Sequence, residues 1–569
     1  MLTVSIQQYI EIIIARLINH IKRFNRGKGG QRLVKKEKIF RHWVDITVEK
    51  LLEQKVEQHV INGGMAASGP IHIGKTRGEI FIQSAVAKKL EKLGKKVKHL
   101  LVVYTQDPLK AKPPLVTREF AEKWKGVRIL NVPCPNNCCS NWVEHWTKPF
   151  YNVLEDFGIT DMKIIDTTSI YESRKMVEAV KIIINKKEKA RKVLSRFKGT
   201  KYPPDWIPFK PLCLKCYNIS TTKAINVDLE KEIVEYYCPR CDSKGQVKLT
   251  QGKLEWRLEW AALWYTLNVT FEPYGKDHAA PGGSRDSCVA IAKEVLGIKP
   301  PLGMAYEWVY VEGKAMSSSG GISFDFNEWP KVAKPQVLKY WYYSSKPLTH
   351  LEFSPLKIPQ LSEEYNKAER VYFGVEEVKE RKIAENMKRS YEIANDERPP
   401  EKIPIQIPYT FAAVLYQIVP KDENFIKVAI KKLIRTGHLK REPNEKEARE
   451  IEKILRRAGY WVEKYGPPNL KIKILEKVPE SILSKLNEKD KEFLYKLGEI
   501  MEKRKWTPEE LEFEIYELAR KVVGIGSRRA FKIAYQILLG RDSGPRLAPF
   551  LLTLDEKFIV KRLKEIAVN

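Results

Sequence analysis

Hydrophobic and polar positions along the first part of the chain predict an α/β unit. Residues 42–59 have the spacing of a short helix, and Val60-Ile61 run into a turn of small residues at 63–70. A helical stretch follows to about Leu93, and the apolar run at 98–104 predicts a buried parallel strand. Strand, small-residue loop and helix in this order are the beginning of a nucleotide-binding α/β fold.

The pattern changes twice further along the chain. Turn residues dominate from about 111 to 255, and apolar periodicity with strand signals resumes at 256–278. A second βα unit is predicted by a helix at 284–296 and a strand at 304–311. From about residue 360 the pattern is almost wholly helical. We therefore expect an α/β, Rossmann-type parallel sheet that is split by an insertion and followed by an all-α region.

Composition indicates the class of partner. The chain has 569 residues, too many for one compact domain. Lys and Arg number 101 against 71 Asp and Glu, a formal net charge of +30. Because such a surplus attracts polyanions, nucleic acid is the first partner to consider and an anionic membrane surface the second. No run of about 18 apolar residues exists, so we expect no membrane span and no stable membrane association.

The basic N-terminal extension has a pattern of its own. Ile6, Ile10, Ile13, Leu17 and Ile21 recur at helical spacing, which predicts an amphipathic helix. The functional interpretation is an arm that touches RNA or a membrane surface. The alternative is an extension outside the common fold, and we favour that alternative.

Two paired C-x2-C motifs predict a metal site. Cys213 and Cys216 are separated by 21 residues from Cys238 and Cys241, the spacing of a four-thiolate tetrahedral zinc site. Four thiolates leave no open position for a substrate, so this zinc site is expected to be structural. A disulfide framework is the alternative, kept open by the disulfide-rich intracellular proteins of hyperthermophiles.

A second group of soft ligands is less standard. Cys134, Cys138, Cys139 and His145 lie within twelve residues, and the turn residues between them can bring the side chains together. We expect a second zinc ion here, with a reduced cysteine cluster as the alternative. Cys288 falls in a predicted helix and is interpreted as a small core residue.

Two short motifs carry the candidate chemistry. His72-Ile73-Gly74-Lys75 stands at a predicted helix start, where free backbone N–H groups favour an anion such as a phosphate. Gly74 lets a nucleotide approach the bare backbone. The segment 314–321 (KAMSSSGG) follows the last strand of the second unit and offers an ammonium, three hydroxyls and free amides. Such a loop can close over a triphosphate and stabilise the charge that develops at the α-phosphate.

These motifs resemble the HIGH and KMSKS signatures of class I aminoacyl-tRNA synthetases. The fuller strings resemble the class I lysyl-tRNA synthetases found mainly in archaea: 67–75 (ASGPIHIGK), 271–287 (FEPYGKDHAAPGGSRDS), 306–308 (YEW) and 315–321 (AMSSSGG). The similarity runs from about His42 to the C-terminus. It implies activation of lysine by ATP to lysyl-adenylate and transfer of the lysyl group to tRNA(Lys), with no protein nucleophile.

The resemblance also assigns site residues and cofactors. Residues implied in the reaction are His72, Gly74, Lys75, Lys314, Met316, Ser317 and Ser318. Gly275 and Asp277 are placed near the ribose of ATP, and Gly64, Trp256, His278 and Tyr306 along the lysine pocket. ATP, Mg²⁺ and two zinc ions are implied, with tRNA(Lys) and L-lysine as partners and the cytoplasm as location. The oligomeric state is left open.

Several assignments have structural alternatives. His72 can simply cap its own loop, Trp256 and Tyr306 can be core aromatics, and His278 can pair with Asp277. The serines of the loop can belong to a flexible linker. The substrate ammonium demands a buried carboxylate, for which Glu259, Glu307 and Glu312 are candidates.

The expected domain organisation follows from the pattern and the resemblance together. It comprises the N-terminal extension (1–39), the first half of the Rossmann domain (40–110), the zinc-bearing insertion (111–255), the second half with the KMSKS-like loop (256–330), a connecting stem (331–360) and a helical anticodon-binding domain (361–569).

The sequence departs from the family pattern at three places. Lys75 ends the HIGH-like motif, where histidine or a small polar residue is usual, and Ala315 stands for the first lysine of KMSKS, with Lys314 one place earlier. The segment 104–107 carries fewer acids than the family pattern. Alternative functions are a synthetase for another amino acid, a small nucleotidyltransferase, or a non-catalytic zinc-bearing tRNA-binding protein.

Overall fold

The computed structural model describes residues 40–198, 202–317 and 323–568. Residues 42–569 form one compact unit, which carries all the elements named below. The N-terminal extension with its expected helix and Ser318 of the KMSKS-like loop lie outside the described residues.

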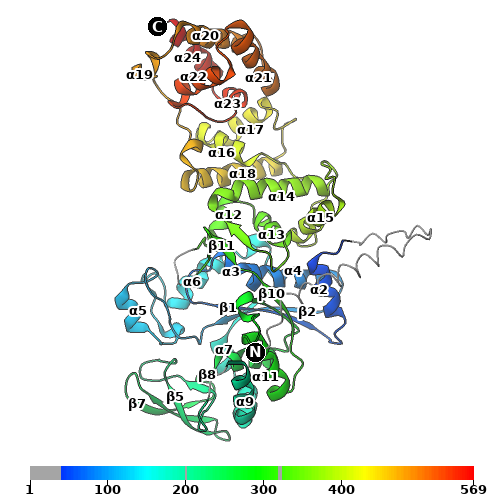
Figure 1. Cartoon of the computed structure of the whole chain (residues 1–569), viewed down its shortest axis with the longest axis vertical. Helices are drawn as coiled ribbons and strands as arrows, with labels where there is room; N and C mark the ends of the chain where they lie inside the picture. Colours follow the sequence, from blue (N-terminus) through cyan, green and yellow to red (C-terminus); the bar gives the residue numbers. More distant parts are fainter. Residues whose placement is uncertain (1–39, 199–201, 318–322, 569) are drawn as a thin grey trace, which may run out of the picture. The chain divides into compact units, whose positions relative to one another are not determined.

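A five-stranded parallel sheet organises the first half of the unit (Figure 1). Its order is β10-β9-β1-β2-β3. The strands are β1 (His59–Ala66), β2 (Val97–Tyr104), β3 (Lys163–Asp166), β9 (Phe271–Gly275) and β10 (Leu302–Tyr306). All neighbouring pairs run parallel, which confirms the expected α/β fold. The edge strand β3 comes from the range 111–255, which was expected to lie outside the sheet.

Helices cover both faces of the sheet. Successive side chains of a strand point to opposite faces, so the apolar strand β2 contributes to a core on each side. On one face Leu101 and Val103 of β2 share a core with α2 (Trp43–Leu52) and α4 (Gln83–Lys92). On the other face Leu100 and Val102 share a core with α8 (Val177–Asn185), α10 (Trp256–Leu267) and α11 (Ser284–Ile291). The near-continuous apolar run of β2 is explained by this double burial.

Two predicted strands differ from the structure. The first twelve residues of 256–278 form the helix α10, which is buried on most sides and therefore lacks the one-sided pattern of a surface helix. The strand expected at 304–311 is divided into β10 and β11 (Val309–Val311). β11 pairs with β12 (Lys314–Ala315) and β13 (Leu351–Phe353) in a separate sheet. The chain changes sheets at Glu307, whose N–H donates to the Pro347 carbonyl.

The helical run after β1 starts at the HIGH-like motif. It consists of α3 (Ile73–Thr76), a π-helical segment (Arg77–Ile82) and α4, which follow one another without a break. The range 111–255 adds the helices α5 (Arg118–Trp124), α6 (Trp142–Tyr151), α7 (Thr167–Glu172) and α9 (Lys187–Lys198) to α8. It also forms two small antiparallel sheets, from β4 (Phe209–Pro211) with β8 (Gly252–Leu254), and from β5 (Lys223–Asp228), β6 (Ile233–Cys238) and β7 (Ser243–Lys248).

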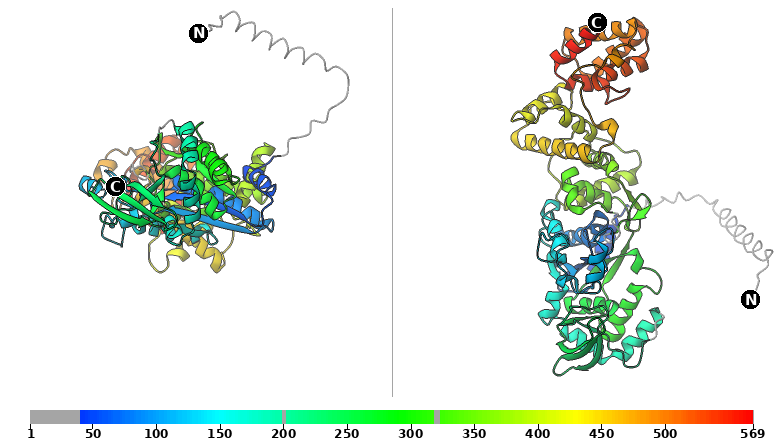
Figure 2. Two further views of the ribbon diagram at one scale, coloured as in Figure 1. Left: turned by 90° about the horizontal axis from the view of Figure 1, so that it is seen from below. Right: turned by 90° about the vertical axis from the view of Figure 1, so that its left-hand side faces the viewer.

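Helices make up the remainder of the chain, as expected; the segments coloured yellow to red are helices joined by loops (Figure 2). They are α12 (Trp329–Val332), α13 (Pro335–Tyr343), α14 (Ile358–Tyr372), α15 (Arg381–Ala394), α16 (Tyr409–Ile418), α17 (Phe425–Arg435), α18 (Glu445–Lys464), α19 (Glu480–Leu483), α20 (Glu488–Lys503), α21 (Pro508–Glu517), α22 (Ser527–Leu539), α23 (Leu547–Thr553) and α24 (Glu556–Val568). None of the helices in the described ranges combines the length and apolar character that a membrane crossing requires.

Glu328 joins the KMSKS-like region to the helical part. Its Oε2 accepts hydrogen bonds from Tyr460 Oη (2.8 Å) and Lys464 Nζ (2.7 Å) of α18, and its Oε1 accepts one from Lys331 Nζ (2.7 Å). A few residues earlier, the Phe324 carbonyl accepts a hydrogen bond from the Ile73 N–H at the start of α3 (3.0 Å). The same short segment therefore contacts both the HIGH-like motif and α18.

We predict that Glu328→Gln lowers the free energy of unfolding by about 1–2 kcal/mol at pH 7, because four charged or hydroxyl donors, Tyr465 Oη (3.2 Å) being the fourth, lose an ionised acceptor. Burial raises the pKa of Glu328, but hydrogen bonds from Lys331, Lys464 and Tyr460 outweigh it and lower the pKa to about 2. The stabilisation is present above the unfolded-state pKa and is lost as pH falls towards 2, so the difference from the wild type should shrink below about pH 4.

Chemical denaturation at several pH values measures this difference. The matched control is Glu452→Gln, which breaks an exposed pair with Arg456 on α18 and should cost little at any pH. A loss of the same size in both variants would contradict the prediction.

Candidate active site

A cavity of about 440 Å³ lies at the start of α3. It is lined by His72, Gly74, Lys75, Glu79, Gly275, Asp277, His278, Tyr306, Trp308, Val309, Ala315, Met316 and Ser317. Residues from the HIGH-like motif, from β9 and β10, and from the KMSKS-like loop therefore face one space. The two separated signatures converge, as the sequence predicted.

His72 both caps α3 and lines this cavity. Its Nδ1 accepts a hydrogen bond from the Lys75 N–H (3.1 Å), so His72 does form the cap that the structural alternative described. Burial, with repulsion by Lys75 second, lowers the pKa of His72 to about 3. The imidazole is therefore neutral at pH 7, and with Nδ1 as acceptor the ring proton is assigned to Nε2. His72 can offer one N–H donor to a bound anion.

The KMSKS-like loop approaches Gly74. A Cβ atom added at Gly74 would lie 3.2 Å from Met316 Sδ and 3.2 Å from Val309 Cβ, so only glycine leaves this wall open. The Met316 N–H donates to the Val309 carbonyl (3.0 Å), which fixes the base of the loop. Lys314 is exposed on β12 and does not line the cavity, and Ser318 lies outside the described residues.

A second cavity of about 420 Å³ adjoins the first. It is lined by Gly64, Ala66, Ala67, Ser68, Lys75, Glu79, Tyr104, Asp107, Pro108, Leu109, Lys110, Ile129, Trp256 and His278. Lys75, Glu79 and His278 line both cavities. Of the residues expected in the lysine pocket, Gly64 and Trp256 line the second cavity, Tyr306 lines the first, and His278 lines both.

Aromatic side chains form one wall of the second cavity. Trp256 stacks on Trp260, with ring centroids 5.3 Å apart, and meets Tyr104 edge-on at 5.5 Å. His278 lies 5.9 Å from Trp256 and 3.4 Å from the Asp277 carboxylate. His278 thus pairs with Asp277, and Trp256 packs against other aromatic rings, as the structural alternatives proposed. Both side chains nevertheless line the cavity.

Glu79 is the carboxylate at the junction of the two cavities. Its Oε1 accepts a hydrogen bond from Tyr306 Oη (2.9 Å) and its Oε2 one from the Gly64 N–H (3.0 Å). Burial raises the pKa of Glu79 to about 8, against the effects of Tyr306 and Lys75. A nearby cation would therefore gain a strong partner, because it would relieve the cost of the buried charge.

Lys75 is the cation at the same junction. Its ammonium donates a hydrogen bond to the Ala66 carbonyl at the end of β1. Burial lowers the pKa of Lys75 to about 8, and attraction by Glu79 acts in the opposite direction. The group is therefore largely protonated at pH 7 and presents positive charge to both cavities.

The expected carboxylates lie elsewhere. Glu259 forms an ion pair with Lys253 (2.6 Å), Glu307 forms one with Lys276 (2.8 Å), and Glu312 is exposed in a turn. None of the three lines either cavity. Sequence reasoning missed Glu79, although the helical spacing of His72, Lys75 and Glu79 places all three on one face.

Both cysteine groups have the geometry of metal ligands. In the group of the two C-x2-C motifs, the Sγ atoms of Cys213 and Cys241 lie 3.6 Å apart, and those of Cys216 and Cys238 lie 3.7 Å apart. A tetrahedral ion with bonds of about 2.3 Å requires roughly 3.8 Å between thiolates. All four ligand atoms lie within 4.8 Å of one another. This group can hold a metal ion.

The group of Cys134, Cys138, Cys139 and His145 also has distances suited to a metal ion. Cys134 Sγ lies 3.6 Å from Cys138 Sγ and 3.4 Å from His145 Nδ1, and Cys139 completes the set. Asn141 caps α6 and so places His145 on the first turns of that helix, facing the cysteines. Cys288 is buried and belongs to neither group.

The parallel sheet, the helix that starts beside the first cavity and the loop that faces it from the second half define a class I aminoacyl-tRNA synthetase fold. Within this class, the chain belongs to the family described as tRNA synthetases class I (K), whose model matches residues 41–397.

Two related lysine–tRNA ligases support this assignment. A lysine–tRNA ligase from Aeropyrum pernix is 35% identical over 541 residues, which cover 92% of this chain and 98% of that protein. One from Methanosphaera stadtmanae is 33% identical over 533 residues, covering 92% of this chain and 99% of that protein. The chain also resembles a solved glutamate tRNA ligase from Elizabethkingia meningosepticum, with a TM-score of 0.41 and 12% identity over 90% of this chain and 100% of the other.

Proposed function

We propose that this protein activates lysine with ATP to lysyl-adenylate and pyrophosphate, and then transfers the lysyl group to tRNA(Lys). The observation that carries the proposal is the pair of adjoining cavities that meet at Lys75 and Glu79. One cavity is lined by both synthetase signatures, and the other by aromatic side chains and the half-buried carboxylate of Glu79. An amino acid and a nucleotide can therefore meet at one junction.

The first cavity is the proposed ATP site. Gly74 and Met316 leave room for the nucleotide, His72 donates its Nε2–H to a phosphate oxygen, and Ser317 lines the same cavity and offers a hydroxyl to the triphosphate. Gly275 and Asp277 line the same cavity and are proposed to face the ribose. Mg²⁺ bound to the triphosphate adds positive charge there.

The second cavity is the proposed lysine site. Gly64, Trp256 and His278 enclose the substrate, and Glu79 accepts its ε-ammonium. Tyr306 holds the carboxylate of Glu79 in place from the other half of the sheet. With the ammonium end fixed at Glu79, the substrate carboxylate is positioned to attack the α-phosphate, and positioning with electrostatic stabilisation carries the rate.

Lys75 is proposed to supply the ammonium that the loop lacks. Lys314 lies outside the cavity, whereas Lys75 lines both cavities from a fixed helix. Its positive charge would offset the repulsion between the substrate carboxylate and the phosphates. Lys75, the unusual ending of the HIGH-like motif, would thus take over the role of the shifted lysine of the loop.

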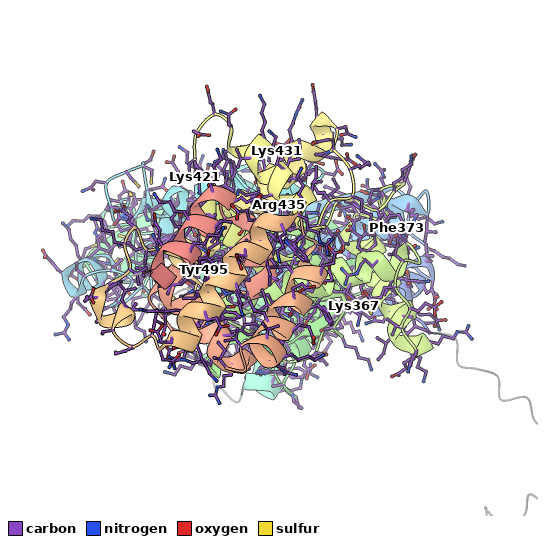
Figure 3. The ribbon with its side chains drawn as sticks, turned by 90° about the horizontal axis from the view of Figure 1, so that it is seen from above. Lys367, Phe373, Lys421, Lys431, Arg435 and Tyr495 are labelled. Atoms are coloured by element: carbon purple, nitrogen blue, oxygen red, sulfur yellow. The ribbon has the colours of Figure 1, made fainter. Side chains whose placement is uncertain are left out.

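The remaining parts are proposed to bind metal and RNA. Zinc is the proposed ion at both cysteine groups, with a structural role. We propose the domain division 1–39, 40–110, 111–255, 256–330, 331–360 and 361–569, with β3 of the insertion completing the sheet. The helical domain is the proposed anticodon reader. Lys421 and Lys431 are exposed on it, and Arg435 is half-buried and pairs with Glu556 (Figure 3). Binding of tRNA should weaken steeply with salt.

The first test is pyrophosphate exchange into ATP with lysine, arginine, cysteine or glutamate, in the presence of tRNA. Lysine alone should support exchange. His72→Ala should reduce exchange by roughly 10²–10³-fold, because a donor to the developing charge is lost, while tRNA affinity stays nearly unchanged.

His72→Asn separates the two contacts of His72. Asparagine can still cap α3 but lacks the Nε2 donor, so it should also be inactive yet as stable as the wild type. His350→Ala, at an exposed histidine that lines neither cavity, is the control. Equal losses of exchange and tRNA affinity in His72→Ala would show that the residue is structural.

Glu79 gives a pH-dependent prediction. Because its pKa in the lysine-free protein is about 8, Glu79 is mostly protonated at pH 7, whereas a bound ammonium requires the ionised form. The Kd for lysine should therefore fall as pH rises from 6.5 to 8. Glu79→Gln should weaken lysine binding by about 3–5 kcal/mol and abolish this pH dependence.

Calorimetric titration with lysine at several pH values measures both effects. Glu312→Gln, in an exposed turn, should leave the Kd and its pH dependence unchanged. A Glu79→Gln variant that still binds lysine with wild-type affinity would remove Glu79 from the proposed site.

Metal content tests the cysteine groups. We expect about two zinc ions per chain, one for each four-ligand group. Cys238→Ser should release one ion and lower the melting temperature, whereas Cys288→Ser, at a buried cysteine outside both groups, should release none. Elemental analysis of the purified proteins gives the counts, and a metal-free wild type would contradict zinc at both groups.

A further inference from the structure

A buried lysine stands behind the wall of the second cavity. Lys253, in β8, places its Nζ 2.6 Å from Asp107 Oδ1 and 2.6 Å from Glu259 Oε2. The Lys253 side chain is 5% exposed and that of Glu259 is 0% exposed, whereas the Asp107 side chain is 35% exposed and lines the cavity. One ammonium therefore joins a carboxylate of the cavity wall to a carboxylate of the core.

The core end of this ion triad is rigidly held. Tyr171 Oη donates to Glu259 Oε1 (3.2 Å), and the Leu254 N–H donates to Tyr171 Oη (2.9 Å). Burial lowers the pKa of Lys253, but attraction by Asp107 and Glu259 outweighs it and raises the pKa above its usual value. Lys253 is thus a permanent positive charge at a fixed position.

The second cavity has two carboxylates of different character. Among the described residues that line it, the acidic ones are Glu79 and Asp107. Asp107 already has an ammonium at 2.6 Å. Glu79 accepts hydrogen bonds from the neutral donors Tyr306 and Gly64, and the Lys75 ammonium donates to the Ala66 carbonyl. Asp107 therefore has a cationic partner in direct contact, whereas Glu79 has none and can accept one from a ligand.

We propose that Lys253 is a positioning and specificity-determining residue of the amino-acid cavity: by neutralising Asp107, it leaves Glu79 as the single carboxylate that captures the side-chain ammonium of the substrate. The inference rests on the proposed function, in which this cavity takes lysine. It adds the reason why lysine binds in one orientation in a cavity that offers two acids.

Removing the ammonium predicts a particular kinetic signature. Without Lys253, the negative charge of Asp107 has no cationic partner, and Asp107 competes with Glu79 for the substrate ammonium. Lysine then binds in a second, unproductive orientation, so that its Kd and KM fall while kcat also falls. A merely structural role for Lys253 would instead lower kcat and stability without tighter binding.

The experiment is a double-mutant cycle of Lys253→Met and Asp107→Asn in the full-length protein. Lysine-dependent pyrophosphate exchange gives kcat and KM, and calorimetry gives the Kd of lysine and of 1,5-diaminopentane, a probe with two ammonium groups and no carboxylate. Lys253→Arg is the conservative variant. Lys210→Met is the matched control, because Lys210 lies opposite Lys253 in the β4–β8 pair and donates to the Ser220 carbonyl.

Lys253→Met should bind both ligands at least about tenfold more tightly and lose about tenfold in kcat, in keeping with one added charge in the cavity. Asp107→Asn alone should change the Kd values by less than about threefold, because Asp107 is already neutralised. Adding Asp107→Asn to Lys253→Met should restore weak binding and most of kcat. Lys253→Arg and Lys210→Met should behave like the wild type.

Two results would overturn the inference. One is an unchanged ligand affinity in Lys253→Met, and the other is a loss of kcat in Lys253→Met that the added Asp107→Asn does not reverse. Should Lys253→Met fail to fold, Lys253→Gln takes its place, because its amide can hydrogen-bond to both carboxylates without a charge. Absence of lysine-dependent exchange in the wild type would refute the proposed function. The diaminopentane titrations would then still decide whether Lys253 neutralises Asp107.

Discussion

A charge inside a protein must have a partner, and this constraint governs the candidate site. Glu259 is a buried carboxylate and Glu79 a half-buried one, and the pKa values of both are raised mainly by loss of water. The chain itself supplies the partner of Glu259, because Lys253 lies 2.6 Å away. Glu79 has only neutral hydrogen-bond donors in direct contact. A cationic ligand that pairs with Glu79 would therefore gain the favourable free energy of an ion pair that the chain does not itself supply there.

Both halves of the α/β domain are needed to hold Glu79. Gly64 belongs to β1 of the first half, and Tyr306 belongs to β10 of the second half. The Tyr306 ring passes so close to Gly78 that a Cβ atom there would lie 1.9 Å from it. The glycine in the helical run after the HIGH-like motif is thus required by the close approach of a ring from the other half. The split of the domain by an insertion leaves this contact intact, because β1 and β10 both flank β9.

Local patterns predicted most of the fold, because they depend on short-range chemistry, and most of the residues expected at the site line one or both cavities. The run at 98–104 became β2 almost to the residue, and the two C-x2-C motifs became one cluster, because spacing alone fixes these geometries. The errors arose where distant contacts decide. The strand signals expected over 256–278 were confirmed at β9, but the helix α10 at the start of this range was not recognised, because a helix buried on most sides shows no polar face.

The choice of carboxylate shows the same limit. Glu259 was a reasonable candidate for the substrate ammonium by residue type, but its charge is already matched by Lys253, which stands six positions earlier in the sequence and reaches Glu259 of α10 from strand β8. No periodicity reports such a pairing. Sequence identifies which residues can carry a charge, whereas the fold decides which of those charges remain unmatched.

The departures at Lys75 and Ala315 are best understood in terms of where a charge is fixed. Lys75 is held on α3 with its ammonium on the Ala66 carbonyl, so the position of this charge does not depend on the KMSKS-like loop. Burial lowers its pKa to about 8, which means that the folded protein already bears part of the cost of placing a cation there. An anion that enters the first cavity relieves this cost, so a preorganised ammonium favours phosphate binding without loop closure. The loop can then serve mainly to exclude water and to position Met316 and Ser317, a task that hydroxyls and small residues perform without a lysine.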